Sequence, residues 1–109
     1  MKLKILFLGL TLGASGAMGV VHADDEQGDP AVGERLAATC MGCHAVAGAR
    51  NAYPSYRVPK IGGQFEEYIV NSLKAYRDGE REHATMHAQA ATLTEQEMRD
   101  IAAFFAQER

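Results

Sequence analysis

The two cysteines of this chain lie in one short motif, Cys40-Met41-Gly42-Cys43-His44. Two thiols three residues apart, with a histidine directly after the second, form the attachment signature for c-type haem. In a helix, residues three and four apart share a face, so Cys40, Cys43 and His44 would lie together. Each thiol can then add to one haem vinyl group to form a thioether, and the imidazole can reach the iron. The motif therefore predicts one covalently bound haem with His44 as its proximal ligand.

The same residues allow three other interpretations. A redox-active dithiol favours a thioredoxin-like βαβ setting, and no strand pattern precedes Cys40. A disulfide would close a very short loop, which adds little stability, and would leave His44 without a role. A structural zinc ion needs four ligands, which His83 or His87 could complete. However, Cys43 and His44 are adjacent, which is awkward for two ligands of one tetrahedral ion. We therefore favour covalent haem.

The N-terminal segment has the pattern of a secretory signal peptide. Lys2 and Lys4 precede a short apolar run at 5–12, and Val21-His22-Ala23 forms a cleavage site of the small-x-small type. A retained anchor is the alternative, but a spanning helix needs about 20 predominantly apolar residues, and glycines interrupt this segment. We expect cleavage after Ala23, no permanent membrane anchor, and export to the periplasm. Covalent haem attachment takes place in such an oxidising compartment.

The charge and size of the exported chain limit its class. Loss of Lys2 and Lys4 reduces the 11 basic residues of the chain to nine against 14 acidic ones, a formal charge of −5. Nucleic-acid binding needs a clustered basic face, so we expect none. We predict that residues 24–29 form a flexible acidic tail and that 30–109 form one domain. Such a small domain buries only about 60% of its unfolded-chain surface, so a large apolar group at its centre would help it fold.

Three main helices and no convincing strand are predicted. Asp29-Pro30 has the pattern of an N-cap followed by proline at the first position, and this helix should run into the haem motif. Residues 45–63 form a long irregular segment, which usually needs something to wrap around. A second helix is predicted at 65–78, with Gly79 as its C′ residue. The last begins at Thr94, which forms a capping box with Glu97.

A second axial ligand for the iron must come from another part of the chain. The candidates are Met86, Met98, His83 and His87, or no residue at all. Met98 has a packing role, because it pairs with Leu93 in a hydrophobic staple at the start of the last helix. Met86 lies between predicted helices, where a strap could cross the distal haem face, and we favour it. A distal histidine would give a lower potential than methionine does, and we interpret both histidines as exposed loop residues.

The whole exported chain resembles a bacterial class I cytochrome c. It is more closely similar to one half of the two-haem cytochromes of the c-four type, and to the haem subunits of flavocytochrome c sulfide dehydrogenases. The matching segments are the haem motif, Val58-Pro59-Lys60-Ile61-Gly62-Gly63-Gln64, Thr85-Met86 eight residues before Thr94, and Asp100-Ile101-Ala102-Ala103-Phe104-Phe105. The resemblance implies an all-α fold, the small class I cytochrome c fold, in which three main helices and loops wrap one covalently bound haem c.

The resemblance also implies roles for individual residues. Met86 matches the distal methionine ligand of the iron. Pro59 matches a haem-pocket proline whose segment packs on the proximal side, near His44. Gly33 matches a small residue where the first helix crosses the last, with Phe104 as the aromatic residue across it. The chain departs from the pattern because it has one haem motif, and because residues 45–58 match poorly. The roles of four residues there stay open: Arg50, Tyr53, Tyr56 and Arg57.

The function that follows is single-electron transfer, with the iron cycling between Fe(III) and Fe(II), and not enzymatic catalysis. We expect redox protein partners at an exposed haem edge near the thioethers, in a monomer or a heteromeric redox complex. A charge of −5 favours a partner with a basic face, or an apolar contact. One alternative is an electron-transfer haem subunit of a larger oxidoreductase, such as a flavocytochrome c sulfide dehydrogenase. The other is a haem sensor or peroxidase-like protein with an open distal site.

Overall fold

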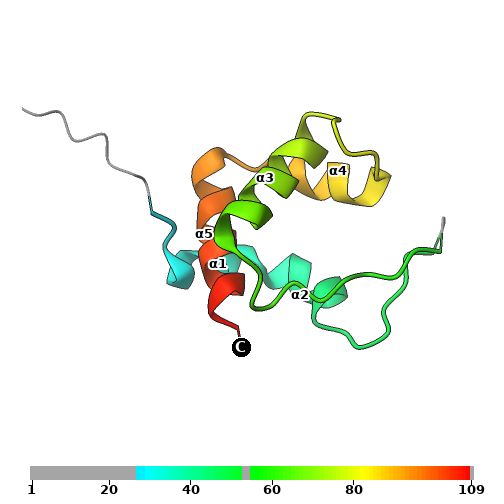
Figure 1. Cartoon of the computed structure of the whole chain (residues 1–109), viewed down its shortest axis with the longest axis horizontal. Coiled ribbons are helices and arrows are strands. Elements are labelled where there is room, and N and C mark those ends of the chain that lie inside the picture. Colours follow the sequence, from blue (N-terminus) through cyan, green and yellow to red (C-terminus); the bar gives the residue numbers. More distant parts are fainter. Residues whose placement is uncertain (1–26, 53–54, 109) are drawn as a thin grey trace, which may run out of the picture.

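The computed structural model describes residues 27–52 and 55–108. The predicted signal peptide, the first half of the predicted acidic tail (24–26) and Tyr53 lie outside these residues. Within them the chain forms five helices and no strand: α1 (Pro30–Leu36), α2 (Ala38–His44), α3 (Glu66–Arg77), α4 (Ala84–Ala90) and α5 (Glu95–Gln107) (Figure 1). None of these helices is long and apolar enough to cross a membrane. The all-α prediction is therefore confirmed.

The first two helices carry the chain from its capped start into the haem motif. The Asp29 carboxylate caps α1 by accepting hydrogen bonds from the backbone N–H groups of Ala31 and Val32, and proline follows it as predicted. One residue, Ala37, separates α1 from α2. Its N–H still donates to the Gly33 carbonyl oxygen at 2.8 Å, and its own carbonyl accepts from Met41 at 2.9 Å. The expected helix into the motif is thus confirmed, with a slight irregularity at Ala37.

Helix α1 crosses α5 at close range. Gly33 is buried at this crossing, and a Cβ atom there would overlap the carbonyl oxygen of Asp100 and lie 3.0 Å from the Cβ of Phe104. Only a glycine lets the two backbones approach this closely. The predicted role of Gly33 is confirmed, with Phe104 across the contact.

The remaining predicted helices have their expected ends. Asp78 follows α3, and Gly79 then adopts a positive φ of 79°, which suits a helix C′ position. Thr94 and Glu97 form both hydrogen bonds of the capping box at the start of α5. The apolar faces of these helices supply most of the core, whose buried members are Ala37, Ile69, Leu73, Ala90, Met98, Ile101, Ala102 and Phe105.

Helix α4 was not predicted. The segment that carries Met86 was expected to be a strap between helices, but Ala84–Ala90 is helical and packs on α3. His83 caps this helix, since its Nδ1 accepts a hydrogen bond from the Met86 N–H at 3.3 Å. His87 Nδ1 lies 2.8 Å from the Tyr76 carbonyl oxygen. Neither histidine belongs to a free loop: His83 is half-buried, and His87 is exposed on α4.

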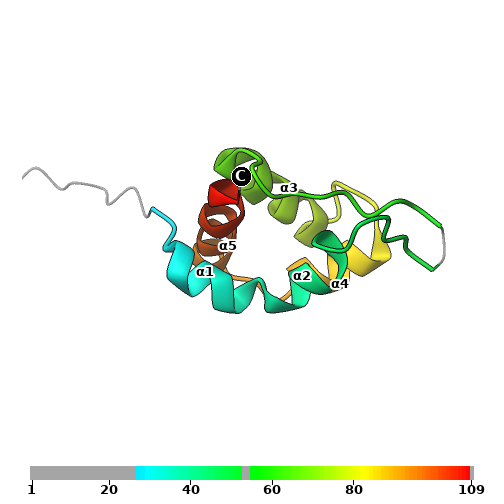
Figure 2. The ribbon, with the colours of Figure 1, turned by 90° about the horizontal axis from the view of Figure 1, so that it is seen from below.

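Seen from below, α1 and α2 run along one side of a helical ring, with α3 opposite (Figure 2).

Candidate functional site

A cavity of about 480 Å³ lies between the helices and the irregular segment that follows α2. This volume falls within the roughly 300–1,000 Å³ that is typical of cofactor pockets. Aliphatic and aromatic side chains cover much of its wall: Leu36, Val58, Ile61, Ile69, Leu73, Leu93, Ile101 and Phe105. No aspartate or glutamate lines the cavity among the described residues. The wall therefore suits a large apolar group.

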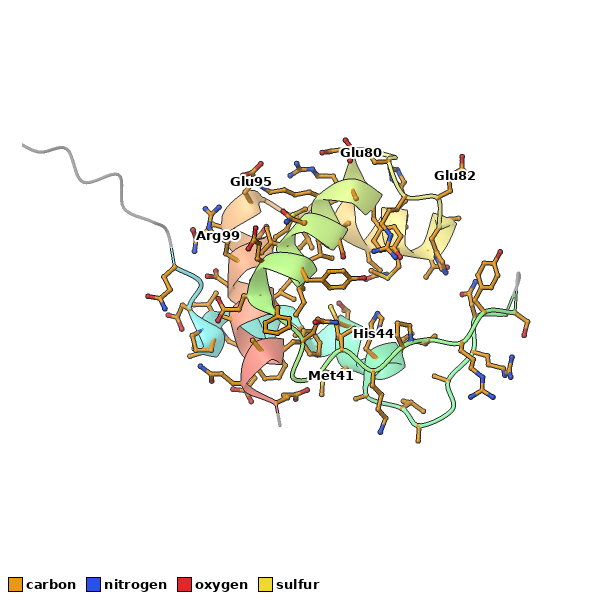
Figure 3. The ribbon with its side chains drawn as sticks, in the orientation of Figure 1. Met41, His44, Glu80, Glu82, Glu95 and Arg99 are labelled. Carbon is orange, nitrogen blue, oxygen red and sulfur yellow. The ribbon has the colours of Figure 1, made fainter. Side chains whose placement is uncertain are left out.

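The three motif residues of α2 all line this cavity. Cys40 is half-buried, Cys43 is exposed, and both are free thiols. Burial is the largest influence on the Cys40 thiol and raises its pKa, so the group stays protonated at neutral pH. Figure 3 shows His44 at the end of α2, on the side of that helix that faces α3 and α4. The predicted shared face of Cys40, Cys43 and His44 is present.

The imidazole of His44 is held by the backbone of the irregular segment. Its Nδ1 lies 2.6 Å from the carbonyl oxygen of Pro59, which also lines the cavity. A carbonyl can only accept, so Nδ1 carries the proton and donates it. The lone pair then lies on Nε2, the atom left free to bind a metal. Histidines that bind metals commonly donate their other ring N–H in this way, which fixes the tautomer and the orientation of the ring.

The four candidates for a second metal ligand differ in whether they line the cavity. Met86 and His83 line the cavity, and Met86 is half-buried there. Met98 is fully buried in the core and does not line the cavity, in agreement with a packing role. His87 is also absent from the lining and is held at the Tyr76 carbonyl. The structure thus brings a thioether to the cavity that holds the imidazole.

The irregular segment turns back on itself at two arginines. Arg50 and Arg57 form an isolated antiparallel bridge, beside a 2.8 Å hydrogen bond from the Asn51 N–H to the Tyr56 carbonyl. Both arginines and Tyr56 line the cavity. Their roles could not be assigned from the sequence, because that depends on how the segment folds. The only sequence feature that could have marked this segment as a basic surface is the absence of any acidic residue from 45 to 65.

Arg81 also lines the cavity and was missed by sequence reasoning. It lies over the ring of Tyr76, with 4.6 Å between its Cζ and the ring centroid, and donates to the Ser72 hydroxyl at 3.1 Å. Nothing in the local sequence marks it, since both of its partners lie on α3.

The alternatives for the cysteine motif find no support in the described part of the chain. No group of three or more histidine, cysteine, aspartate or glutamate side chains is placed there to hold a metal ion. The two cysteines are not joined, and no strand precedes them among residues 27–52. The apolar wall, the paired free thiols and the oriented imidazole instead fit a covalently attached haem.

An all-α ring with two thiols and an oriented imidazole facing one apolar cavity defines the class of small c-type haem proteins. The comparison with protein families agrees, because the model of the family described as Cytochrome c matches residues 30–107. The chain belongs to the cytochrome c family. Members of this family bind covalently attached haem, and they are electron-transfer proteins, not enzymes, although some are subunits of oxidoreductases.

Three curated relatives are similar to this chain. Cytochrome c4 of Pseudomonas aeruginosa is 36% identical over 109 residues, which is 100% of this chain and 50% of the relative. Cytochrome c-554(548) of Halomonas halodenitrificans is 41% identical over 81 residues, which is 72% of this chain and 94% of the relative. The cytochrome subunit of sulfide dehydrogenase of Chlorobaculum tepidum is 33% identical over 73 residues, which is 67% of this chain and 63% of the relative.

The chain thus spans about half the length of the cytochrome c4 relative. A solved structure of cytochrome c4 from Acidithiobacillus ferrooxidans superimposes with a TM-score of 0.61 at 24% identity. That match covers 78% of this chain and 52% of the other. It confirms the cytochrome c fold that the sequence predicted.

Proposed function

We propose that this chain is a single-electron carrier that holds one haem c. In this proposal Cys40 and Cys43 form the thioethers, and His44 and Met86 are the axial ligands. The observation that carries it is the placement of His44 and Met86 on one apolar cavity, from α2 and α4 respectively. When bound, the haem supplies a one-electron iron couple, whose potential methionine ligation raises.

The chain's own residues hold this arrangement with little freedom to move. The Pro59 carbonyl fixes the ring of His44, and the cap by His83 secures the backbone at Met86. With the group bound, the aliphatic and aromatic part of the wall would keep water from it, which would lower the local dielectric. If His44 and Met86 both bind the metal, no open site would remain there for a substrate, which would favour electron transfer over catalysis. Cys43, which is exposed, marks the side on which the group would approach the surface.

The cellular setting belongs to the same proposal. The signal-peptide pattern of residues 1–23 supports export to the periplasm, where the chain would exchange electrons with redox proteins. The expected state is a monomer or a member of a heteromeric redox complex.

The second candidate is a haem subunit of a larger oxidoreductase. One relative is the cytochrome subunit of a sulfide dehydrogenase. Large apolar side chains are also exposed, with Phe65 at 81%, Tyr56 at 58% and Tyr68 at 54%. A permanent partner needs a larger and less polar patch than a transient redox encounter does. Purification from the native cell distinguishes the two: a free small haem protein supports the carrier, and co-purification with a flavoprotein supports the subunit.

Visible spectra in both redox states test the ligand set. We expect a low-spin, six-coordinate c-type spectrum with a sulfur-to-iron charge-transfer band in the oxidised protein. Met86→Ala should abolish that band, because it removes the thioether from the cavity. Met98→Leu is the matched control, since it changes a methionine that does not line the cavity and nearly conserves volume. It should leave the band intact.

Two outcomes would reject parts of the proposal. A high-spin wild-type spectrum, or one unchanged by Met86→Ala, removes Met86 from the ligand set and favours the sensor or peroxidase-like alternative. The second outcome is loss of the haem on acid–acetone extraction, after expression with haem-attachment machinery. It would reject the proposal that Cys40 and Cys43 form thioethers.

A further inference from the structure

The segment after the haem motif is basic in an otherwise acidic protein. Residues 45–65 contain Arg50, Arg57 and Lys60 and no acidic residue, although the whole chain has 14 acidic and 11 basic residues. All three side chains are exposed. We refer to Arg50, Arg57 and Lys60 as the basic loop.

Two of these charges face each other. The isolated bridge places Arg50 opposite Arg57, and the Val58 N–H donates to the Ala49 carbonyl at 2.9 Å beside it. Directly opposite residues of an antiparallel pair have Cβ atoms about 4.5–5.5 Å apart, and like charges there are destabilising. Within residues 27–52 and 55–108, neither guanidinium has an ion-pair partner. An anionic group bound between them would relieve this repulsion.

Of the five other basic side chains in the described residues, Lys74, Arg77 and Arg99 form ion pairs, whereas Arg35 and Arg81 form none. Glu95 lies 2.9 Å from Lys74, 3.7 Å from Arg77 and 4.0 Å from Arg99, and Arg77 also pairs with Asp78 at 2.9 Å. Figure 3 shows Glu80, Glu82 and Glu95 along the edge of the molecule away from His44. Among residues 45–52 and 55–65, Arg50, Arg57 and Lys60 have no ion-pair partner. The same segment contacts the residues after Glu82, because the ring centroids of Tyr56 and His83 lie 6.0 Å apart.

The basic loop borders the candidate haem site. Arg50 and Arg57 line the cavity that Cys43 and His44 also line, and Lys60 directly follows the Pro59 that holds His44. We propose that the basic loop docks an acidic surface of a redox protein, with partner carboxylates binding Arg50 and Arg57. Arginine binds carboxylates through paired, parallel hydrogen bonds. This inference rests on the proposed electron-transfer function. It predicts a partner with an acidic face, whereas the net charge alone predicted a partner with a basic face.

The local field, more than the net charge, sets how fast a charged reagent approaches the site. The test uses the reduced full-length holoprotein and two oxidants, anionic ferricyanide and cationic tris(phenanthroline)cobalt(III). One electron passes from the protein to the oxidant, giving ferrocyanide or the cobalt(II) complex. Stopped-flow rates are recorded as ionic strength rises from about 0.01 to 0.5 M, where screening lengths shorten from about 30 Å to a few ångströms. We expect the ferricyanide rate to fall by about 10-fold and the cobalt rate to rise.

Single-charge variants locate the effect. Arg50→Gln and Arg57→Gln should each flatten the salt dependence with ferricyanide. Arg35→Gln is the matched control: it removes the same charge from an exposed side chain of α1, which bonds only to the Ala31 carbonyl at 3.0 Å and does not line the cavity. It should leave the wild-type dependence in place.

Several results would overturn the proposal. A ferricyanide rate that rises with salt in the wild type would show that the net charge dominates. Equal effects of Arg35→Gln and Arg57→Gln would remove any local role. If a shifted reduction potential fully explains the rate changes in Arg50→Gln and Arg57→Gln, these arginines act on the bound haem and not on a docking partner. Binding to phosphatidylglycerol vesicles at about 0.15 M salt, lost in Arg50→Gln, would assign them to a membrane surface.

Spectra of the same samples separate the two proposals. A six-coordinate spectrum with the wrong salt dependence rejects only the docking surface. A high-spin spectrum rejects the proposed ligand set, whatever the salt dependence.

Discussion

The hydrogen bond between His44 and the Pro59 carbonyl prepares the imidazole before any metal binds. Because Nδ1 is committed at 2.6 Å, the ring presents Nε2 in a fixed direction. Such an outer contact also raises the basicity of a ligating histidine. A backbone carbonyl supplies it, and the fixed φ of proline removes one of the two backbone torsions that place that carbonyl. The protein backbone itself therefore orients the imidazole ring of His44, the proposed proximal ligand.

A second residue-scale contact holds the start of the domain. The buried Asp100 carboxylate accepts from the Asp29 backbone N–H at 2.8 Å and from the Gln96 side-chain amide at 2.9 Å. Asp100→Ala leaves both donors without this acceptor, so we expect the free energy of unfolding to fall by about 1–3 kcal/mol. Asp100→Asn keeps an acceptor oxygen and should lose less. Urea unfolding of the holoprotein, followed by circular dichroism, measures both; equal losses would contradict the hydrogen-bond explanation.

The residues that carry chemistry were predictable to different degrees. Cys40, Cys43 and His44 are marked by spacing alone, since a helix places them on one face. Met86 needed the resemblance, because nothing local distinguishes it from a packing methionine. The structure places it on the cavity with His44, and its role as a ligand stays a prediction.

The crossing of α1 and α5 is the tightest contact between elements. Gly33→Ala would place a methyl group against the Asp100 carbonyl, so the helices must separate. We expect a loss of about 1–3 kcal/mol, which corresponds to a melting temperature lower by roughly 4–8 °C per kcal/mol in a domain of this size. Thermal unfolding of the holoprotein measures it.

Gly42→Ala is the control for this substitution. Gly42 is also helical, in α2, but a Cβ there meets nothing within 4 Å. Alanine should then stabilise that helix by about 0.5–1 kcal/mol. Equal melting temperatures for the two variants would show that the crossing does not require glycine.

Helix ends were predictable where the chain carries local signals. The Asp29 cap, Gly79 and the Thr94–Glu97 capping box each act within a few residues. Helix α4 lacks such signals, because its N-cap is the ring of His83 and not a serine, threonine, aspartate or asparagine side chain. Its contact with α3 is non-local, so the sequence indicated only a connecting segment.

The acidic edge makes the whole molecule sensitive to low pH. Hydrogen bonding to Lys74 lowers the pKa of Glu95, and hydrogen bonding to Arg77 lowers the pKa of Asp78. Carboxylates with a lowered pKa stabilise the fold above their unfolded values of about 4, and this stabilisation is lost as the pH falls through their folded values. We therefore expect the urea midpoint to decrease below about pH 4.

Glu95→Gln should weaken this decrease slightly, because the pairs are exposed and screened by salt. Glu34→Gln, an exposed carboxylate outside the Glu95 cluster, is the matched control. Urea midpoints between about pH 3 and pH 6 compare the variants. An identical pH profile for Glu95→Gln and the wild type would show that Glu95 does not contribute to the loss of stability at low pH.

The whole-molecule charge pattern was the least predictable property. The net charge follows from a count, but its distribution depends on which segments meet. The placement of Arg50 and Arg57 beside the cavity could not be inferred, because the other lining residues come from distant parts of the sequence. The fold class, in contrast, follows from helical periodicity together with the haem motif.

A spectroelectrochemical titration of the full-length holoprotein tests the central claim most directly. If the chain is a single-electron carrier with His44 and Met86 on one metal, the spectrum should convert reversibly between two low-spin, six-coordinate forms. The potential dependence should fit one Nernst wave for one electron. A high-spin oxidised form, a wave that does not reverse, or conversion that requires more than one electron would contradict the account.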